Sequence, residues 1–223
     1  MQVLRSMDPG WLSNAYLLYD EPGGTAVFVD SGAPLEPLLE VVERERLTAT
    51  HLLTTHSHAD HVAGDGELVR RFGVPVVKGP VETGGLRVEA LPTPGHSSDM
   101  LAFVVNGEAV FTGDTLFRDS VGGGDFEGVR RSVMDVLMSL PPETRVYPGH
   151  TDETTIGREW EENPFVRVWR GAQPEGTERC RVGGQEATLV VWSPDYDGKG
   201  KAWVRLADDG RDAIVGGSRV ERL

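Results

Sequence analysis

Three of the six histidines in the chain lie close together, in the sequence Thr-His-Ser-His-Ala-Asp-His. They are His56, His58 and His61, and Asp60 stands between the last two. The preceding residues have the pattern of a strand, so alternation places His56 and His58 on the same side, where both imidazoles can bind one cation. Asp60 and His61 then turn to the other side and can bind a second cation. Because neighbouring imidazoles repel one another when protonated, such a cluster indicates a metal site.

Three further residues of ligand type each follow a strand-like segment and a glycine. His96 ends the sequence Thr-Pro-Gly-His, Asp114 follows Phe-Thr-Gly, and His150 ends Tyr-Pro-Gly-His. Glycine permits the tight turn that aims the next side chain into a shared cleft. Each of the three alone is consistent with an ordinary loop residue. Together they leave only His51, which lies inside a predicted strand and is expected to be structural.

Strand and helix patterns alternate along the first three quarters of the chain, which favours an α/β arrangement of sheets covered by helices. The expected strands are 26–32, 50–56, 74–79, 86–96 and 144–150, and the expected helices are 34–47, 66–73, 127–140 and 154–164. A hairpin is expected over 101–114, where Asn106-Gly107 is a strong turn signal.

Beyond about residue 172 the helical patterns stop. Strand-like segments follow at 186–192, 201–206 and 212–223, separated by clusters of turn residues. We therefore expect a catalytic domain over residues 1–171 and a small β-rich extension over 172–223. Trp192 and Trp203 stand within these strands and are expected to lie in the core.

The order of the ligand-type residues resembles that of the metallo-β-lactamase superfamily over residues 1–170. The pattern is H-x-H-x-D-H, followed by a histidine, an aspartate and a last histidine. The resemblance implies an α/β fold of the αββα sandwich type, with metals at one edge of the sheets. It implies two divalent ions, zinc first, with iron and manganese as alternatives. The implied ligands are His56, His58 and His96 for the first metal, Asp60, His61 and His150 for the second, and Asp114 as the bridge.

Within the superfamily the chain most resembles the glyoxalase II (hydroxyacylglutathione hydrolase)-like branch. The segments that carry this resemblance are 113–117, 147–150 and 154–165, together with aspartate rather than cysteine at position 114. The branch implies a binuclear hydrolase that cleaves a thioester, or a related ester or lactone, through a metal-bridging hydroxide. Asp60 is then a ligand that can also orient the attacking hydroxide, which makes it the candidate catalytic residue.

Two departures from the branch argue against glutathione as the thiol. Residues 122–126 read Gly-Gly-Gly-Asp-Phe where the branch usually has a basic residue, and the tail is β-rich where glyoxalase II enzymes bind glutathione through helices. An alternative function is a mononuclear iron persulfide dioxygenase, whose family resembles this chain in fold and motif. Its iron would be held by the residues matching His56, His96 and Asp114. The missing arginine counts against this alternative, whereas the complete ligand set fits both.

The composition of the chain limits the kinds of partner that the protein is expected to bind. The formal net charge is −13 and the basic residues are scattered, which argues against nucleic acid. Nucleic-acid-processing members of the superfamily carry a large insertion before the last histidine, and here 35 residues separate Asp114 from His150. No apolar run is long enough to span a membrane and the N-terminus has no secretory pattern, so we expect a cytoplasmic protein. From the resemblance we expect a small-molecule thioester or ester as its substrate. The sequence is compatible with a homodimer.

The sulfur chemistry of the chain is limited, because Cys180 is its only cysteine. An intrachain disulfide is therefore excluded, and so is a metal site built from several thiolates. Cys180 lies at the start of a strand-like segment, with no histidine or basic cluster around it. We expect it to be structural.

Overall fold

The computed structural model describes residues 1–223 and divides into two compact units. The first unit consists of residues 1–92, 101–113 and 147–151, and the second of residues 93–100, 114–146 and 152–223. The α/β class is confirmed, and the tail is β-rich as expected. The boundary predicted between residues 171 and 172 stays a prediction.

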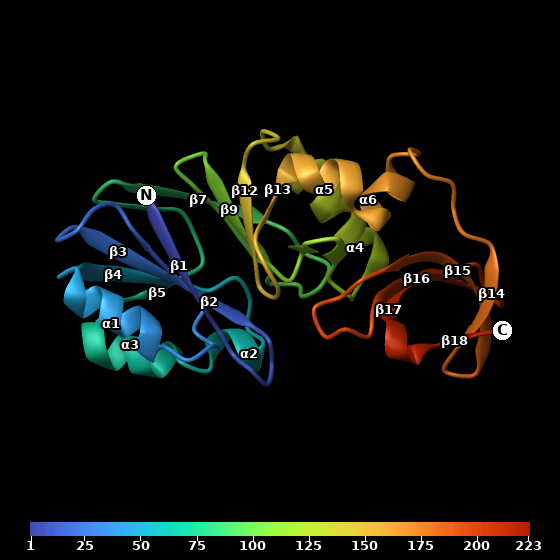
Figure 1. Ribbon diagram of the computed structural model, residues 1–223, viewed down its shortest axis with the longest axis horizontal. Helices are drawn as coiled ribbons and strands as arrows, with labels where there is room; N and C mark the ends of the chain where they lie inside the picture. Colours follow the sequence, from blue (N-terminus) through green and yellow to red (C-terminus); the bar gives the residue numbers. More distant parts are fainter. The chain divides into compact units, whose positions relative to one another are not determined.

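A five-stranded mixed sheet, of order β1-β2-β3-β4-β5, forms the first layer of the first unit (Figure 1). Its strands are β1 (Gln2–Met7), β2 (Asn14–Tyr19), β3 (Thr25–Val29), β4 (Thr48–Leu53) and β5 (Val76–Val77). The pairs β1–β2 and β2–β3 are antiparallel, whereas β3–β4 and β4–β5 are parallel. Parallel pairs need long crossovers, and these are supplied by α1 (Glu36–Arg44) and α3 (Asp65–Phe72).

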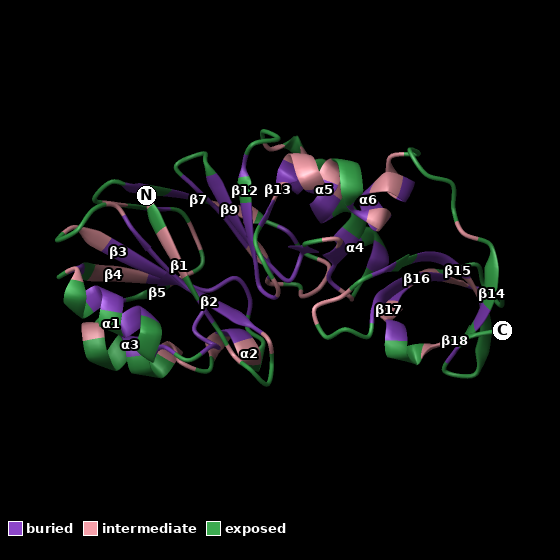
Figure 2. Ribbon diagram, viewed as in Figure 1, coloured by how far each residue is buried: buried purple, intermediate pink, exposed green.

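The helices α1 and α3 cover one face of this sheet, as Figure 1 shows. Apolar residues at helical spacing face inward and charged residues face outward, which Figure 2 shows as buried and exposed stripes. The buried side chains of this layer include Phe28, Leu38, Leu52 and Leu68. The predicted end of the second helix is confirmed, because Gly73 takes a left-handed conformation with φ 67°.

The opposite face of the sheet packs against four strands that pair antiparallel in series. They are β6 (Val81–Thr83), β7 (Leu86–Pro92), β8 (Leu101–Val105) and β9 (Ala109–Gly113). The predicted hairpin is confirmed: Asn106 and Gly107 have φ values of 54° and 69°, as a type I′ turn requires. These strands belong to a sheet of order β13-β12-β9-β8-β7-β6, completed by β12 (Arg145–Pro148) and β13 (Thr154–Thr155).

The second unit contains a short hairpin and a group of helices. Its hairpin is formed by β10 (Leu116–Phe117) and β11 (Ser120–Val121), and its helices are α4 (Phe126–Arg131), α5 (Ile156–Glu162) and α6 (Pro164–Trp169). The helix predicted over 127–140 continues beyond α4, but as a π-helical turn, Ser132–Val136, and a 3₁₀ turn, Leu137–Ser139.

The helix predicted over 154–164 differs from the structure at both ends. Its first two residues form β13, and its end is a break at Asn163. The Asn163 side chain accepts hydrogen bonds from the backbone of Phe165 and Val166, which starts α6 as a separate helix with Pro164 in its first turn. An N-cap followed by proline is a strong helix start, and the periodicity of the sequence does not show it.

The C-terminal residues form an antiparallel sheet of order β17-β16-β15-β14-β18. Its strands are β14 (Glu178–Val182), β15 (Gln185–Ser193), β16 (Lys201–Leu206), β17 (Asp212–Gly216) and β18 (Val220–Arg222). Trp203 is buried as expected, and Cys180 is buried as well. The expectation for Trp192 is wrong: it is 38% exposed, because Val191 and Ser193 on the other side of β15 face inward.

Membrane-spanning helices are absent from the structure, since none combines the necessary length with sufficient apolar character.

Candidate metal centre

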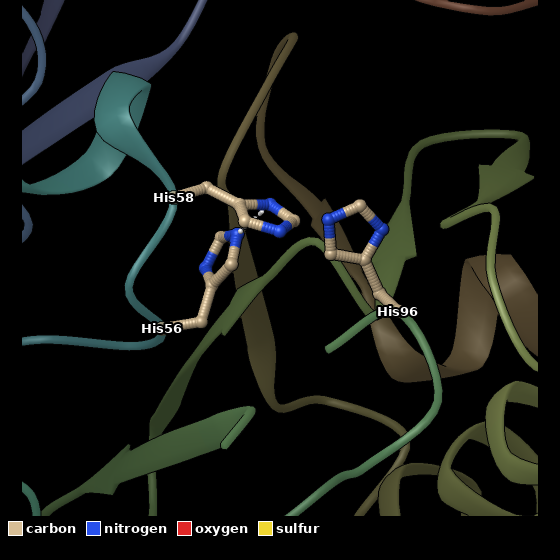
Figure 3. Close-up of side chains that lie close together, drawn as sticks. All are labelled: His56, His58 and His96. Carbon is tan, nitrogen blue, oxygen red and sulfur yellow. Dashed lines mark hydrogen bonds between the residues drawn. The ribbon is translucent and has the colours of Figure 1, made fainter. Parts of the chain in front are cut away.

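The histidine loop follows β4 in the first unit and leads into a single helical turn, α2 (Ala59–Val62). His56 Nε2 lies 3.0 Å from His58 Nδ1, and Figure 3 shows the two imidazoles turned toward each other. Two nitrogens on one zinc ion in tetrahedral geometry are about 3.3 Å apart, given Zn–N distances of about 2.0–2.1 Å. The prediction that these two histidines share one side is confirmed. His96, drawn in the same figure, belongs to the second unit.

A second group in the first unit consists of Asp60, His61 and His150, whose possible ligand atoms all lie within 4.8 Å of one another. Asp60 Oδ2 is 3.7 Å from His61 Nε2 and 3.6 Å from His150 Nε2. Both imidazoles are buried, whereas the Asp60 side chain is 27% exposed. The group thus presents two nitrogens and a carboxylate oxygen, and the carboxylate is accessible to solvent.

Asp30, at the end of β3, orients His61. Its carboxylate is buried and accepts a hydrogen bond of 2.8 Å from His61 Nδ1. It also accepts bonds from the backbone N–H and the hydroxyl of Thr55, each 2.8 Å long. With Nδ1 carrying the hydrogen, the lone pair of His61 lies on Nε2, the atom that faces Asp60.

A backbone carbonyl orients His150 in the same way. His150 Nδ1 donates to the Leu12 carbonyl at 2.9 Å. Leu12 has a φ of 59°, a conformation that non-glycine residues adopt rarely and mostly where the surroundings impose it. Ser13 forms a β-bridge with His150, and the Asn14 N–H donates to the Gly149 carbonyl at 2.7 Å. The segment before β2 therefore fixes both the backbone and the ring of His150.

Gly32 allows the loop after β3 to lie directly against α2. A Cβ atom built on Gly32 would lie 1.7 Å from the Asp60 carbonyl oxygen. Beside it, the Ser31 N–H donates to the His61 carbonyl at 2.7 Å. Only glycine fits at this position, because the backbone that carries Asp60 and His61 occupies the space of a side chain.

The second unit holds the remaining two predicted ligands side by side. His96 Nε2 lies 3.5 Å from Asp114 Oδ2, and the Asp114 side chain is buried. His96 Nδ1 donates to the Gly123 carbonyl at 2.9 Å. As in the first unit, the outer nitrogen is held by an oxygen, so Nε2 is the atom that can bind a metal.

Residues 122–125, called the glycine segment from here on, contact both of these ligand loops. The Gly122 N–H donates to the Thr115 carbonyl at 3.3 Å, next to Asp114, and the Asp125 N–H donates to the Gly95 carbonyl at 2.9 Å, next to His96. A Cβ atom on Gly122 would lie 1.9 Å from the Asp114 carbonyl oxygen. The segment lies against the ligand loops because it carries no side chains there.

The donor set fits divalent transition metals. Imidazole nitrogens with carboxylate oxygens suit zinc, iron and manganese, and Nδ1 atoms held by carboxylate or carbonyl oxygens are the usual outer contacts of metal-binding histidines. The chain thus carries His/Asp clusters consistent with a binuclear metal site.

Sequence reasoning missed Asp30, the Leu12 carbonyl and the glycine segment as contributors to the site. Asp30 alone had a readable signal, since it ends an apolar strand as the predicted ligands do. His51 is half-buried in β4, where Nδ1 lies 3.0 Å from the Thr50 hydroxyl. Its predicted place inside a strand is confirmed.

The sequence profile of the Metallo-beta-lactamase superfamily matches residues 8–84 and 79–150, a stretch that contains every predicted ligand. A hydroxyacylglutathione hydrolase of Rhodopseudomonas palustris (strain BisA53) is 37% identical over an alignment of 158 residues, which covers 60% of this chain and 61% of that protein.

Two solved structures are similar at comparable identity. ETHE1 from Myxococcus xanthus is 31% identical with a TM-score of 0.67, over 78% of this chain and 92% of that one. TTHA1623 in a di-iron-bound form is 32% identical with a TM-score of 0.61, over 73% of this chain and 100% of that one. The chain therefore belongs to the metallo-β-lactamase superfamily and has its α/β fold, extended by an antiparallel C-terminal sheet.

Proposed function

We propose that the protein is a binuclear metal-dependent hydrolase that cleaves a thioester, or a related ester or lactone. The observation that carries the proposal is the orientation of the imidazoles: His61, His96 and His150 each have Nδ1 bonded to an oxygen and Nε2 directed at a carboxylate. Such an arrangement leaves the lone pairs on the atoms that face the carboxylates, as metal binding needs.

The proposed ligand sets follow the order of the family motif. His56, His58 and His96 would hold one ion, Asp60, His61 and His150 the other, and Asp114 would bridge them. Two divalent ions held there would lower the pKa of a coordinated water, so that hydroxide is present near neutral pH, and would polarise the substrate carbonyl.

Asp60 has a role of its own in this proposal. Its side chain is 27% exposed, whereas His61 and His150 beside it are buried. Asp60 can therefore both bind the ion and hold the attacking water by accepting its hydrogen. The buried carboxylate of Asp30 would help to offset the positive charge of an ion bound to His61.

A thioester is the preferred substrate class because one relative is named hydroxyacylglutathione hydrolase. Glutathione itself is not the thiol that we propose. The glycine segment carries no basic side chain that could bind a glutathione carboxylate, and the C-terminal region is a sheet.

A second candidate function is a mononuclear iron persulfide dioxygenase. Two observations bear on it: a similar structure holds iron, although as two ions, and His96 Nε2 lies 3.5 Å from Asp114 Oδ2. With His56 they would make a set of two histidines and one carboxylate, which suits iron that activates oxygen.

The two functions are separated by assaying the metal-loaded protein with a panel of thioesters and lactones, and in parallel with a persulfide while oxygen consumption is recorded. The hydrolase predicts thiol release from a thioester or ring opening of a lactone, in both cases without oxygen uptake. It also predicts loss of at least about 100-fold of the rate in Asp60→Asn. Oxygen uptake with a persulfide and no hydrolysis across the panel would contradict it.

A further inference from the structure

The glycine segment has a second contact surface, on the C-terminal sheet. Gly124 forms an antiparallel β-bridge with Ile214 in β17. A Cβ atom built on the neighbouring Gly123 would lie 3.6 Å from the Ile214 carbonyl oxygen. The backbone that accepts the hydrogen bond from His96 is thus paired directly with an edge strand of the C-terminal sheet.

The same strands also hold the residue that follows the segment. Phe126, the first residue of α4, packs against Trp203 of β16 with ring centroids 4.9 Å apart and against Trp169 of α6 at 6.2 Å. Trp203 is 4% exposed and is the register partner of Ile214. One pair of strands therefore contacts both the backbone of the glycine segment and the side chain next to it.

Charged groups fix this pair of strands in turn. The Asp212 carboxylate accepts a bond of 2.8 Å from Trp203 Nε1 and one of 2.9 Å from Arg205 Nε. Arg205 also donates through both terminal nitrogens to Glu175, at 2.6 and 3.1 Å. These bonds hold the Trp203 ring in one orientation against Phe126.

The reason for such a support lies in the glycines themselves. Three successive glycines lose more conformational entropy on ordering than any other residues and offer no side chains to anchor. They are nevertheless required, because Gly122 and Gly124 have no room for a Cβ against the ligand loops: the nearest atoms are at 1.9 Å and 2.2 Å. Their order must come from the elements packed on their other side.

We propose that the C-terminal sheet is a support for the metal ligands of the second unit, and that Trp203 and Ile214 are positioning residues for His96 and Asp114. They act through the glycine segment, whose carbonyl at Gly123 bonds His96 and whose N–H at Gly122 bonds the residue after Asp114. The inference rests on the proposed function to the extent that these two residues bind a metal.

The test measures metal dissociation constants by competition with a chromophoric chelator, for the full-length wild type and two variants, Trp203→Leu and Phe126→Leu. Each variant should weaken the metal held by His96 by about tenfold or more, as expected when a contact behind a metal ligand is lost. The double variant should be about as weak as either single one, because both changes remove the same contact. Trp192→Leu is the matched control, since that tryptophan lies in the same sheet and contacts Arg222, Gly200 and Gly217 instead.

Folding is checked in each variant by near-ultraviolet circular dichroism and thermal unfolding before the titration. If Trp203→Leu does not fold, Phe126→Leu decides. Dissociation constants within twofold of wild type in a folded Phe126→Leu or Trp203→Leu variant would overturn the inference, as would an equal loss in Trp192→Leu. His96 and Asp114 belong to the ligand sets of both candidate functions, the hydrolase and the dioxygenase. The number of metals bound therefore tests the function, and the ratio of the dissociation constants of variant and wild type tests the inference.

Discussion

The two units hold their proposed metal ligands by different means. In the first unit, His61 lies in the helical turn α2 and is oriented by the buried carboxylate of Asp30. In the second unit, His96 and Asp114 come from two separate loops and are held by backbone groups of a segment rich in glycine. The orientation of His61 thus depends on one side chain that can be exchanged, whereas that of His96 depends on the shape of the backbone.

This difference decides which substitutions each unit can tolerate. A carboxylate that bonds a histidine can be replaced by an amide of nearly the same volume, so the effect of the substitution is chemical and local. A glycine in close contact can be altered only by adding atoms, so its effect is steric.

Gly32→Ala should have the largest effect, because the new methyl group would overlap the Asp60 carbonyl oxygen, 1.7 Å from its position. We expect a loss of more than about 3 kcal/mol in unfolding free energy, measured by urea denaturation of the metal-free protein. Gly66→Ala is the control: it meets only the flexible end of Arg70, at 3.7 Å, and should stabilise α3 by about 0.5–1 kcal/mol. Equal stability of the two variants would refute the close-contact argument.

Gly122→Ala and Gly123→Ala compare neighbouring positions in the second unit. The first places a methyl group 1.9 Å from the Asp114 carbonyl oxygen, and the second places one at ordinary contact distance, 3.6 Å from the Ile214 carbonyl oxygen. We expect Gly122→Ala to weaken metal binding by about 10- to 100-fold, and Gly123→Ala to remain within a few-fold of wild type. The account is wrong for this unit if the order is reversed in chelator competition.

Asp30→Asn tests the chemical orientation in the first unit. An asparagine whose carbonyl accepts from the Thr55 N–H turns its NH₂ group toward His61 Nδ1, which must then accept. The hydrogen moves to Nε2 and blocks the ligand atom, so metal binding should weaken by about 10- to 100-fold. Asp65→Asn is the matched control, since Asp65 accepts a bond from Ser31 and none from a histidine. Nitrogen-15 shifts of the His61 ring would show whether the hydrogen has moved.

Asp20→Asn should have the smallest effect and measures what a carboxylate gains from backbone N–H groups away from the ligands. The hydrogen bond from Gly85 is the largest cause of the lowered pKa of Asp20, and Glu21 and Thr25 donate as well. A lowered pKa stabilises the folded state above the unfolded value of about 3.9, and this contribution disappears as the pH falls through the folded value. Asp20→Asn should therefore cost up to about 1 kcal/mol at pH 7 and less near pH 3. A stability difference that is independent of pH would contradict this origin.

The sequence predicted the parts of the molecule that local patterns determine. The turn at Asn106-Gly107, the helix that ends at Gly73 and the adjacent placement of His56 and His58 all follow from a few neighbouring residues. The α/β class follows from the alternation of patterns.

The remainder depends on contacts between distant segments. The sequence shows that residues 122–126 lack a basic side chain, but not that glycines there lie against Asp114 and pair with β17. Likewise, an aspartate at the end of a strand does not reveal which histidine it will contact. Trp192 and Trp203 both stand within strand-like segments, yet only Trp203 is buried. The superfamily could be recognised from the sequence because ligand types are few and their order is specific, whereas the substrate class stays a proposal.

The most direct test of the central claim is the metal content of the protein purified without added metal, determined per chain by inductively coupled plasma mass spectrometry. The account predicts about two divalent ions per chain in the wild type and about one in His150→Ala, which removes a ligand from one set only. A single iron per chain, unchanged in His150→Ala, would contradict the binuclear hydrolase and favour the dioxygenase.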